Sequence, residues 1–187
     1  MRCGDVPMAD DLRLEIGSGR RPTPGYLHND VRAFDHVEFA CNAWEVSLPS
    51  DTLEEVIALG VIEHLTFRQV EKTFRNVHRM LRRDGRFVFG APDLLVWSEY
   101  LYDVLRAKPC PFTKEHVLAT IYGWQRWDGD EHKSGWTKES LTQKLKEFGF
   151  GRVVDGEEHF KTKPELWRRR LGRPEDAHVR IIAIKSI

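Results

Sequence analysis

The sequence has little of what marks a secreted, membrane-spanning or nucleic-acid-binding protein. Its 187 residues include three widely spaced cysteines, Cys3, Cys41 and Cys110, which argues against a disulfide framework and against a Cys-x-x-Cys metal site. No apolar run approaches the length of about eighteen residues that a transmembrane helix needs, and the first residues lack the apolar stretch of a signal peptide. Lysine plus arginine equals aspartate plus glutamate at 29 each, so no charge excess points to nucleic acid or to an anionic membrane. We therefore expect a cytoplasmic protein with a small-molecule partner and a disordered tail at residues 1–10.

Strand and helix patterns alternate along the remaining chain, which predicts a single α/β domain over residues 11–187. A chain of this length is expected to bury roughly 70% of the surface that its unfolded form exposes. Strands are predicted at residues 12–16, 26–30, 36–39, 54–59, 86–90, 152–155 and 178–184. The Pro-rich run at 21–25 leaves room only for an abbreviated first helix.

Two later helices have clear start signals. Thr66 and Gln69 form a possible capping box, and an apolar face then continues to Leu81, before a turn in which Gly85 is expected to be left-handed. Thr137 begins the second helix. Between these elements, residues 91–135 form a long aromatic-rich connection, and connections of this length are usually lids or binding loops.

A glycine loop follows the first predicted strand. The run Leu-Arg-Leu-Glu-Ile-Gly-Ser-Gly places Glu15 just before Gly17 and Gly19, and glycines at such a point let the backbone pass close to a ligand. A dinucleotide-binding fold would need a third glycine where Pro22 stands. Because the sequence also lacks a Tyr-x-x-x-Lys pair, an NAD-dependent oxidoreductase is disfavoured.

This loop and five further motifs resemble class I S-adenosylmethionine (SAM) methyltransferases of the type-11 kind. The motifs are, in order, Gly-Tyr-Leu-His-Asn-Asp at 25–30, Leu-Pro-Ser-Asp at 48–51, Ala-Leu-Gly-Val-Ile-Glu-His-Leu at 58–65, Met-Leu-Arg-Arg-Asp-Gly at 80–85 and Ala-Pro-Asp at 91–93. Arg21 departs from the family pattern at its last glycine. Looser motifs at 121–125, 132 and 149–150 resemble a small bacterial branch of predicted methyltransferases linked to sugar and polysaccharide modification.

The resemblance implies a Rossmann-like sheet, mostly parallel with an antiparallel last strand, and helices on both faces. Ligands of such sheets bind beyond the carboxyl ends of the strands. The methionine part of SAM would then lie against Glu15, Gly17, Ser18 and Gly19. Asp30, at the end of the second strand, would accept hydrogen bonds from both ribose hydroxyls. For the glycine loop, the alternative is a tight turn without a ligand. For Asp30, the alternative is an exposed aspartate in a turn.

The adenine and sulfonium ends of SAM have candidates after the third and fourth strands. Asn42 stands where the family commonly has an acid for the adenine amino group, and its carbonyl can accept the same hydrogen bond. Ala43 is beside it, and Trp44 offers a stacking face, with core packing as the alternative. Leu59 and Gly60 are expected beside the sulfonium.

Methyl transfer from a sulfonium is an in-line displacement, so positioning supplies much of the catalysis and a base helps when the acceptor is a hydroxyl. His132 is the preferred base, with Asp93 and His64 as alternatives. His64 can instead brace the helix that follows it. A divalent cation could bind to Asp128, Asp130, Glu131 and His132, but their spacing matches no metal-binding loop, so a solvated acidic turn is favoured and no metal site is expected there.

These features predict a SAM-dependent O-methyltransferase that acts on a small molecule, with a hydroxyl of a sugar or glycan precursor as the favoured acceptor. The alternative is a SAM-binding regulatory or assembly protein without transferase activity.

Overall fold

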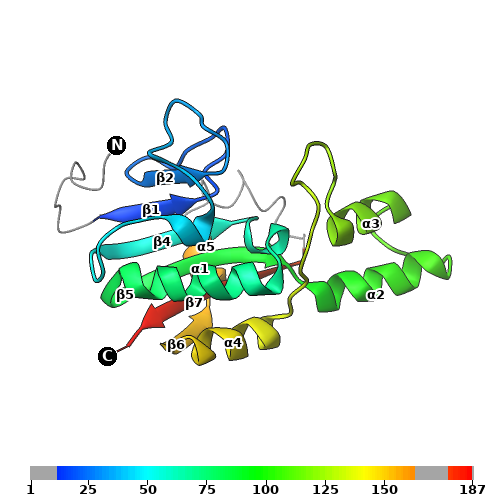
Figure 1. Ribbon diagram of the computed structural model, residues 1–187. Helices are drawn as coiled ribbons and strands as arrows, with labels where there is room; N and C mark the ends of the chain where they lie inside the picture. Colours follow the sequence, from blue (N-terminus) through cyan, green and yellow to red (C-terminus); the bar gives the residue numbers. More distant parts are fainter. Residues whose placement is uncertain (1–11, 163–176, 187) are drawn as a thin grey trace.

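A computed structural model describes residues 12–162 and 177–186, which form a seven-stranded sheet with helices packed against it (Figure 1). The predicted tail at 1–10 lies outside the described residues. The order across the sheet is β3-β2-β1-β4-β5-β7-β6. The strands span Arg13–Ile16 (β1), Leu27–Asp30 (β2), Phe39–Ala40 (β3), Leu53–Leu59 (β4), Leu81–Pro92 (β5), Phe150–Asp155 (β6) and His178–Lys185 (β7).

The direction of the strands confirms the predicted topology. β1, β2, β3, β4 and β5 pair in parallel, whereas β7 runs antiparallel to both of its neighbours, with Val88 of β5 opposite Ile182. The carboxyl ends of β1, β2, β4 and β5 therefore meet at one edge of the sheet. Residues 17–26 form turns without a helix, so the abbreviated first helix that was predicted there is absent.

Helices cover both faces of the sheet. They span Phe67–Met80 (α1), Leu94–Leu105 (α2), Lys114–Tyr122 (α3), Lys138–Glu147 (α4) and Glu157–Thr162 (α5), with short 3-10 turns at Ala43–Glu45 (η1) and Ile62–His64 (η2). Thr66 caps α1 in a capping box with Gln69, as predicted. On the other face, Phe160 of α5 packs with Ile57 and Val88 in a second apolar cluster.

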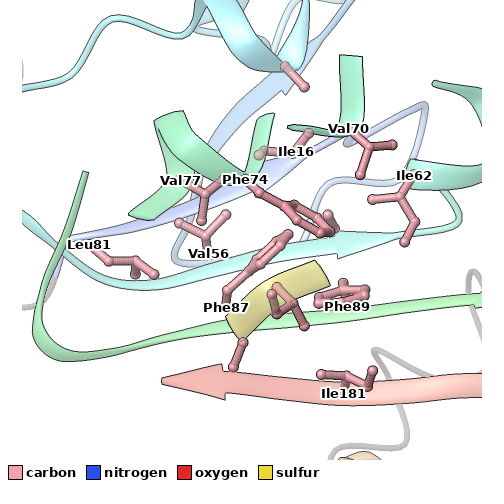
Figure 2. Packing of buried hydrophobic residues seen from close by; sticks show 14 of the residues in the cluster. Ile16, Val56, Ile62, Val70, Phe74, Val77, Leu81, Phe87, Phe89 and Ile181 are labelled. Carbon is pink, nitrogen blue, oxygen red and sulfur yellow. The ribbon is translucent and has the colours of Figure 1, made fainter. Parts of the chain in front are cut away.

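The main core lies between α1 and the central strands (Figure 2). Val70, Phe74 and Val77 form one side of α1 and are fully buried, while Phe87 and Phe89 of β5 pack against Phe74 with ring centroids 5.8 and 5.9 Å away. Burying a large side chain of this kind contributes about 1.5–3 kcal/mol. This core fixes β4 and β5, and with them the loops that follow both strands.

The predicted end of α1 is wrong. The helix stops at Met80, because Leu81 already pairs with Leu53 in the sheet. The left-handed residue of the turn is Asp84 (φ 60°) and not Gly85. Glycine at 85 has a steric reason, since an added Cβ would lie 2.8 Å from the Arg82 carbonyl oxygen and 3.0 Å from that of Leu53. The third strand also begins later than predicted, at Phe39.

Residues 91–135 contain two helices that the sequence analysis did not predict. α2 and α3 project beyond the edge of the sheet where β5 ends (Figure 1). Their contact is aromatic: Trp97 is 1% exposed and lies against Tyr100, Phe112 and His116. In the described part of the chain, no helix combines the length and apolar character that crossing a membrane requires.

Candidate active site at the carboxyl ends of the strands

The glycine loop after β1 lies against the loop after β4. Gly17 has a φ of 69°, and a Cβ added to it would lie 2.5 Å from Cγ2 of Val61. Gly19 is also left-handed, at 56°. Ser18 is buried, its amide donates to the Asn29 carbonyl at 2.9 Å, and its hydroxyl lies 3.3 Å from Nε2 of His36. Gly17 therefore packs closely against Val61, and the approach of this loop to a ligand stays a prediction.

Asp30 ends β2 and connects to this loop. Its buried carboxylate accepts hydrogen bonds from the Gly19 amide at 2.8 Å and from the amide and Nε of Arg32 at 2.9 and 3.1 Å. Burial acts to raise the pKa of Asp30, but the hydrogen bonds from Arg32 and Gly19 outweigh it and hold the pKa below its usual value. Asp30 is thus ionised and braces the glycine loop, and a ribose would share the carboxylate with Arg32.

Glu15 has a similar bracing role. Its carboxylate accepts hydrogen bonds from the amide and hydroxyl of Thr23, at 2.7 and 2.9 Å, and lies 3.7 Å from Nε2 of His28. These contacts close the turn between β1 and β2. Glu15 therefore shapes the loop that was predicted to receive the methionine part of SAM.

The segment after β3 forms η1, with Asn42 at its start. The Asn42 side-chain amide donates to the Glu45 carboxylate at 2.8 Å, Ala43 is buried, and Trp44 is half-buried. After β4, Leu59 is buried, while Gly60 is left-handed (φ 66°) and donates its amide to the Gly90 carbonyl at 3.0 Å. The predicted adenine and sulfonium residues thus follow β3 and β4 at the same edge as Gly17 and Asp30.

Two of the three predicted catalytic residues lie together. The rings of His64 and His132 meet edge to face with centroids 4.8 Å apart, although 68 positions separate them in the sequence. The chain around His132 is held against η2, because the amides of Lys133 and Ser134 donate to the Glu63 carbonyl at 2.7 and 3.1 Å. Burial, and then the neighbouring His64, lowers the pKa of His132 to about 4, and burial also lowers the pKa of His64. Both rings are neutral near pH 7.

Asp93 is placed differently. It is the N-cap of α2, and its Oδ1 accepts from the Leu95 amide at 3.0 Å. Its backbone pairs with Trp136 in an isolated bridge. The structure therefore gives Asp93 a role in ordering the start of α2, directly after β5.

A pocket opens beside the two histidines. Its walls include Glu63, His132, Trp136, Pro92, Thr120 and Ile121. It therefore lies between η2, the end of β5 and the end of α3. Val61, which contacts the glycine loop, directly precedes η2. The segment 91–135 supplies much of the lining, and its role as a lid stays a prediction.

The same segment also reaches the cofactor side of the site. The Arg32 guanidinium, which donates to Asp30, stacks over the ring of Trp127 at 5.6 Å. In the acidic turn beside it, Asp130 accepts from the amide and Nε of Arg126, and Glu131 pairs with Lys133. Both carboxylates are thus used to hold this turn.

Four residues of the site escaped the sequence analysis, namely Arg32, His36, Val61 and Glu63. Arg32 and His36 follow β2 in a stretch without a motif, so only their long-range contacts reveal them. Val61 and Glu63 stand inside the motif at 58–65. The sequence signal for Glu63 was an acid next to a histidine within an apolar run.

Known proteins share this architecture. Residues 21–89 match the methyltransferase domain family. A SAM-dependent methyltransferase from Archaeoglobus fulgidus superposes with a TM-score of 0.57, at 19% identity over 95% of this chain and 87% of that chain. A methyltransferase of the same description from Mesorhizobium loti gives 0.52, at 18% identity over 96% and 94%.

A third solved structure carries bound ligands. The 1,6-didemethyltoxoflavin-N1-methyltransferase of Burkholderia thailandensis, solved with 1,6-didemethyltoxoflavin and S-adenosylhomocysteine, gives a TM-score of 0.58 at 16% identity, over 94% of this chain and 71% of that chain. No curated protein matches the chain. The described residues therefore have the Rossmann-like fold of these enzymes.

Proposed function

We propose that the chain is a class I methyltransferase that uses S-adenosylmethionine and transfers the methyl group to a small-molecule acceptor whose reacting group enters the pocket beside His132. The observation that carries the proposal is the placement of the pocket. It opens directly beyond η2, and η2 follows Val61, the residue against which Gly17 lies. A cofactor on the glycine loop and an acceptor in the pocket would be neighbours.

The cofactor, when bound, supplies an electrophilic methyl group on a sulfonium. In this proposal the loop of Glu15, Gly17, Ser18 and Gly19 receives its methionine part, with backbone amides available to the carboxylate. Asp30 holds the ribose, and Leu59 and Gly60 border the sulfonium. The adenine lies along Asn42, Ala43 and Trp44.

The acceptor that we favour is a hydroxyl of a sugar or glycan precursor. Trp124 and Trp127 are about half exposed, at 51% and 48%, and Tyr122 is 57% exposed, so the segment 91–135 presents flat apolar surfaces of the kind that stack on sugar rings. Trp127 also links this segment to Arg32 and hence to Asp30. We infer that the segment is a substrate lid within a single domain, and that the enzyme works in the reducing cytoplasm, which fits its scattered cysteines.

His132 is the proton acceptor in this proposal. Its ring is neutral near pH 7 and borders the pocket, so one ring nitrogen can take the proton of a hydroxyl as the oxygen attacks the methyl carbon. The new bond is oxygen to carbon, and the carbon–sulfur bond breaks with its electron pair remaining on sulfur. Asp93 and His64 are the alternative bases, of which Asp93 is already engaged as a helix cap.

A SAM-binding regulatory or assembly protein is the second candidate. It is favoured by Arg21 at the last glycine of the family pattern and by Asn42 in place of an acid. Turnover of labelled SAM against a panel of sugars, nucleotide sugars and small amines separates the two. The proposal predicts stoichiometric label transfer to at least one hydroxyl acceptor, and transfer to amines alone would refute the acceptor class. Tight SAM binding without transfer to any acceptor would favour the regulatory role.

A further inference from the structure

Three side chains beside the pocket bring atoms that can bind a metal ion close to one another. One ligand atom from each of Glu63, His64 and His132 lies within 4.8 Å of the other two. Glu63 and His64 belong to η2, and His132 comes from the far end of the segment 91–135. The cluster therefore joins two parts of the chain that the fold brings together.

Glu63 is the unusual member of this cluster. It is 5% exposed, and its Oε2 has no hydrogen-bond partner among the described residues. Leaving a buried carboxyl oxygen unpaired costs about 1–3 kcal/mol. Such an atom at the wall of a pocket can accept a further partner, and a cation is one that a carboxylate binds.

His64 already has one ring nitrogen committed to the backbone. Nδ1 of His64 lies 3.2 Å from the Glu131 carbonyl, and because a carbonyl only accepts, Nδ1 carries the proton and Nε2 is left with a lone pair. At His132, the backbone of Thr120 and Ile121 acts to raise the pKa of the ring, against the stronger effect of burial. Backbone carbonyls that fix the second nitrogen are the usual outer support of metal-binding histidines.

The surroundings hold the three ligands in place and leave one side open. The Ser134 hydroxyl donates to the Ile62 carbonyl at 3.1 Å, and the His132 amide donates to the Tyr122 carbonyl at 3.0 Å. The open side is the pocket, whose lining includes Glu63 and His132. A bound ion would thus have an entry path and a free coordination position.

We propose that Glu63, His64 and His132 bind one divalent first-row transition metal ion, with Zn²⁺ as the reference ion. Two imidazoles and one carboxylate with an open position are a donor set that suits Zn²⁺ or Fe²⁺, whereas Mg²⁺ and Ca²⁺ prefer oxygen ligands. The site differs from the acidic turn that the sequence analysis considered, since of those residues only His132 takes part. The proposal does not rest on methyl transfer, because it follows from the three side chains alone.

Metal binding and the base role of His132 exclude each other, because one lone pair cannot serve both. With an ion bound, His132 is a ligand, and the ion itself would lower the pKa of a hydroxyl in the open position. The site therefore predicts that an acceptor hydroxyl is activated by the metal in the loaded protein and by His132 in the stripped protein.

The test is metal titration of the purified full chain after treatment with a chelator. Co²⁺ binding is followed by its visible absorption, and Zn²⁺ by competition with a chromophoric chelator. We expect one equivalent to bind with a Kd of about 1 μM or tighter. E63Q, H64Q and H132Q should each weaken binding at least about tenfold. Mg²⁺ should show no saturable binding.

The matched control is D128N, which removes an exposed acid of the neighbouring turn and leaves the Glu131 side chain and carbonyl in place. It should bind the metal as the wild type does. Circular dichroism and SAM titration of every variant separate loss of the site from loss of the fold or of cofactor binding. The proposal is refuted if the wild type binds less than one equivalent, or if folded cluster variants retain full affinity, which would place the ion on cysteines or the acidic turn.

Discussion

Asp30 is the single residue on which the proposed cofactor site depends most. Its carboxylate braces Gly19 and is proposed to hold the ribose, so Asp30→Ala removes both interactions. We expect a loss of about 2 kcal/mol or more in SAM binding, which is roughly thirtyfold in Kd. Isothermal titration measures the loss, and circular dichroism checks the fold.

Arg32→Ala is the control for Asp30. It removes the charged donor that occupies the carboxylate but leaves the carboxylate itself. Arg32→Ala should bind SAM clearly more tightly than Asp30→Ala does, because the ribose hydroxyls can replace the guanidinium as partners of the Asp30 carboxylate. Unchanged SAM affinity in folded Asp30→Ala would remove Asp30 from the site.

His132 is tested by its effect on turnover. Because His132 is the proposed general base, His132→Ala should lower kcat by about a hundredfold to ten-thousandfold, while SAM affinity stays nearly intact. Because burial and His64 lower the pKa of His132 to about 4, the decline of wild-type kcat that comes from protonation of His132 should lie below about pH 5. Activity of the variant within a few-fold of wild type would reject the base role. Repeating the comparison in chelator shows whether the effect is due to a base or to a metal ligand.

At the scale of elements, the pair α2 and α3 depends on one aromatic contact. Trp97 joins the two helices, and its Nε1 donates to the Ala177 carbonyl at 2.8 Å, beside β7. Trp97→Ala should destabilise the protein by about 3 kcal/mol or more, because it opens a cavity and breaks this hydrogen bond. Urea unfolding followed by circular dichroism measures the change.

Trp124→Ala is the matched control, because Trp124 lies in the same segment but is 51% exposed. Its loss should cost less than about 1 kcal/mol. Equal destabilisation by both variants would contradict the assignment of Trp97 as the residue that holds α2 to α3.

The helices also show which elements a sequence can predict. α1 and α4 carry capping boxes and a regular apolar face, since each packs along the sheet, and both were predicted. α2 and α3 project from the sheet and bury only Trp97 and Val117 respectively, so their sequences lack a clear apolar stripe. Their N-cap residues, Asp93 and Thr113, are single residues without a capping box, so they can be recognised only when the helix that follows is known.

At the scale of the whole molecule, the sheet and its antiparallel strand were predictable, because apolar strands alternate with helices and the motifs occur in a fixed order. The candidate site was predictable only as residues at strand ends. The contacts of Asp30 with Arg32 and of His64 with His132 were not, because they depend on how loops fold back over the sheet edge. The unpaired oxygen of Glu63 is a property of burial, and burial of one acid inside an apolar motif leaves no periodic signal.

Cofactor binding tests the central claim most directly. Isothermal titration of the purified chain with SAM, S-adenosylhomocysteine and NAD should give saturable one-to-one binding of the first two and no binding of NAD, because the loop with Gly17, Gly19 and Pro22 suits a methionine moiety and lacks the third glycine of a dinucleotide site. No heat with either SAM or S-adenosylhomocysteine, together with binding of NAD, would contradict it.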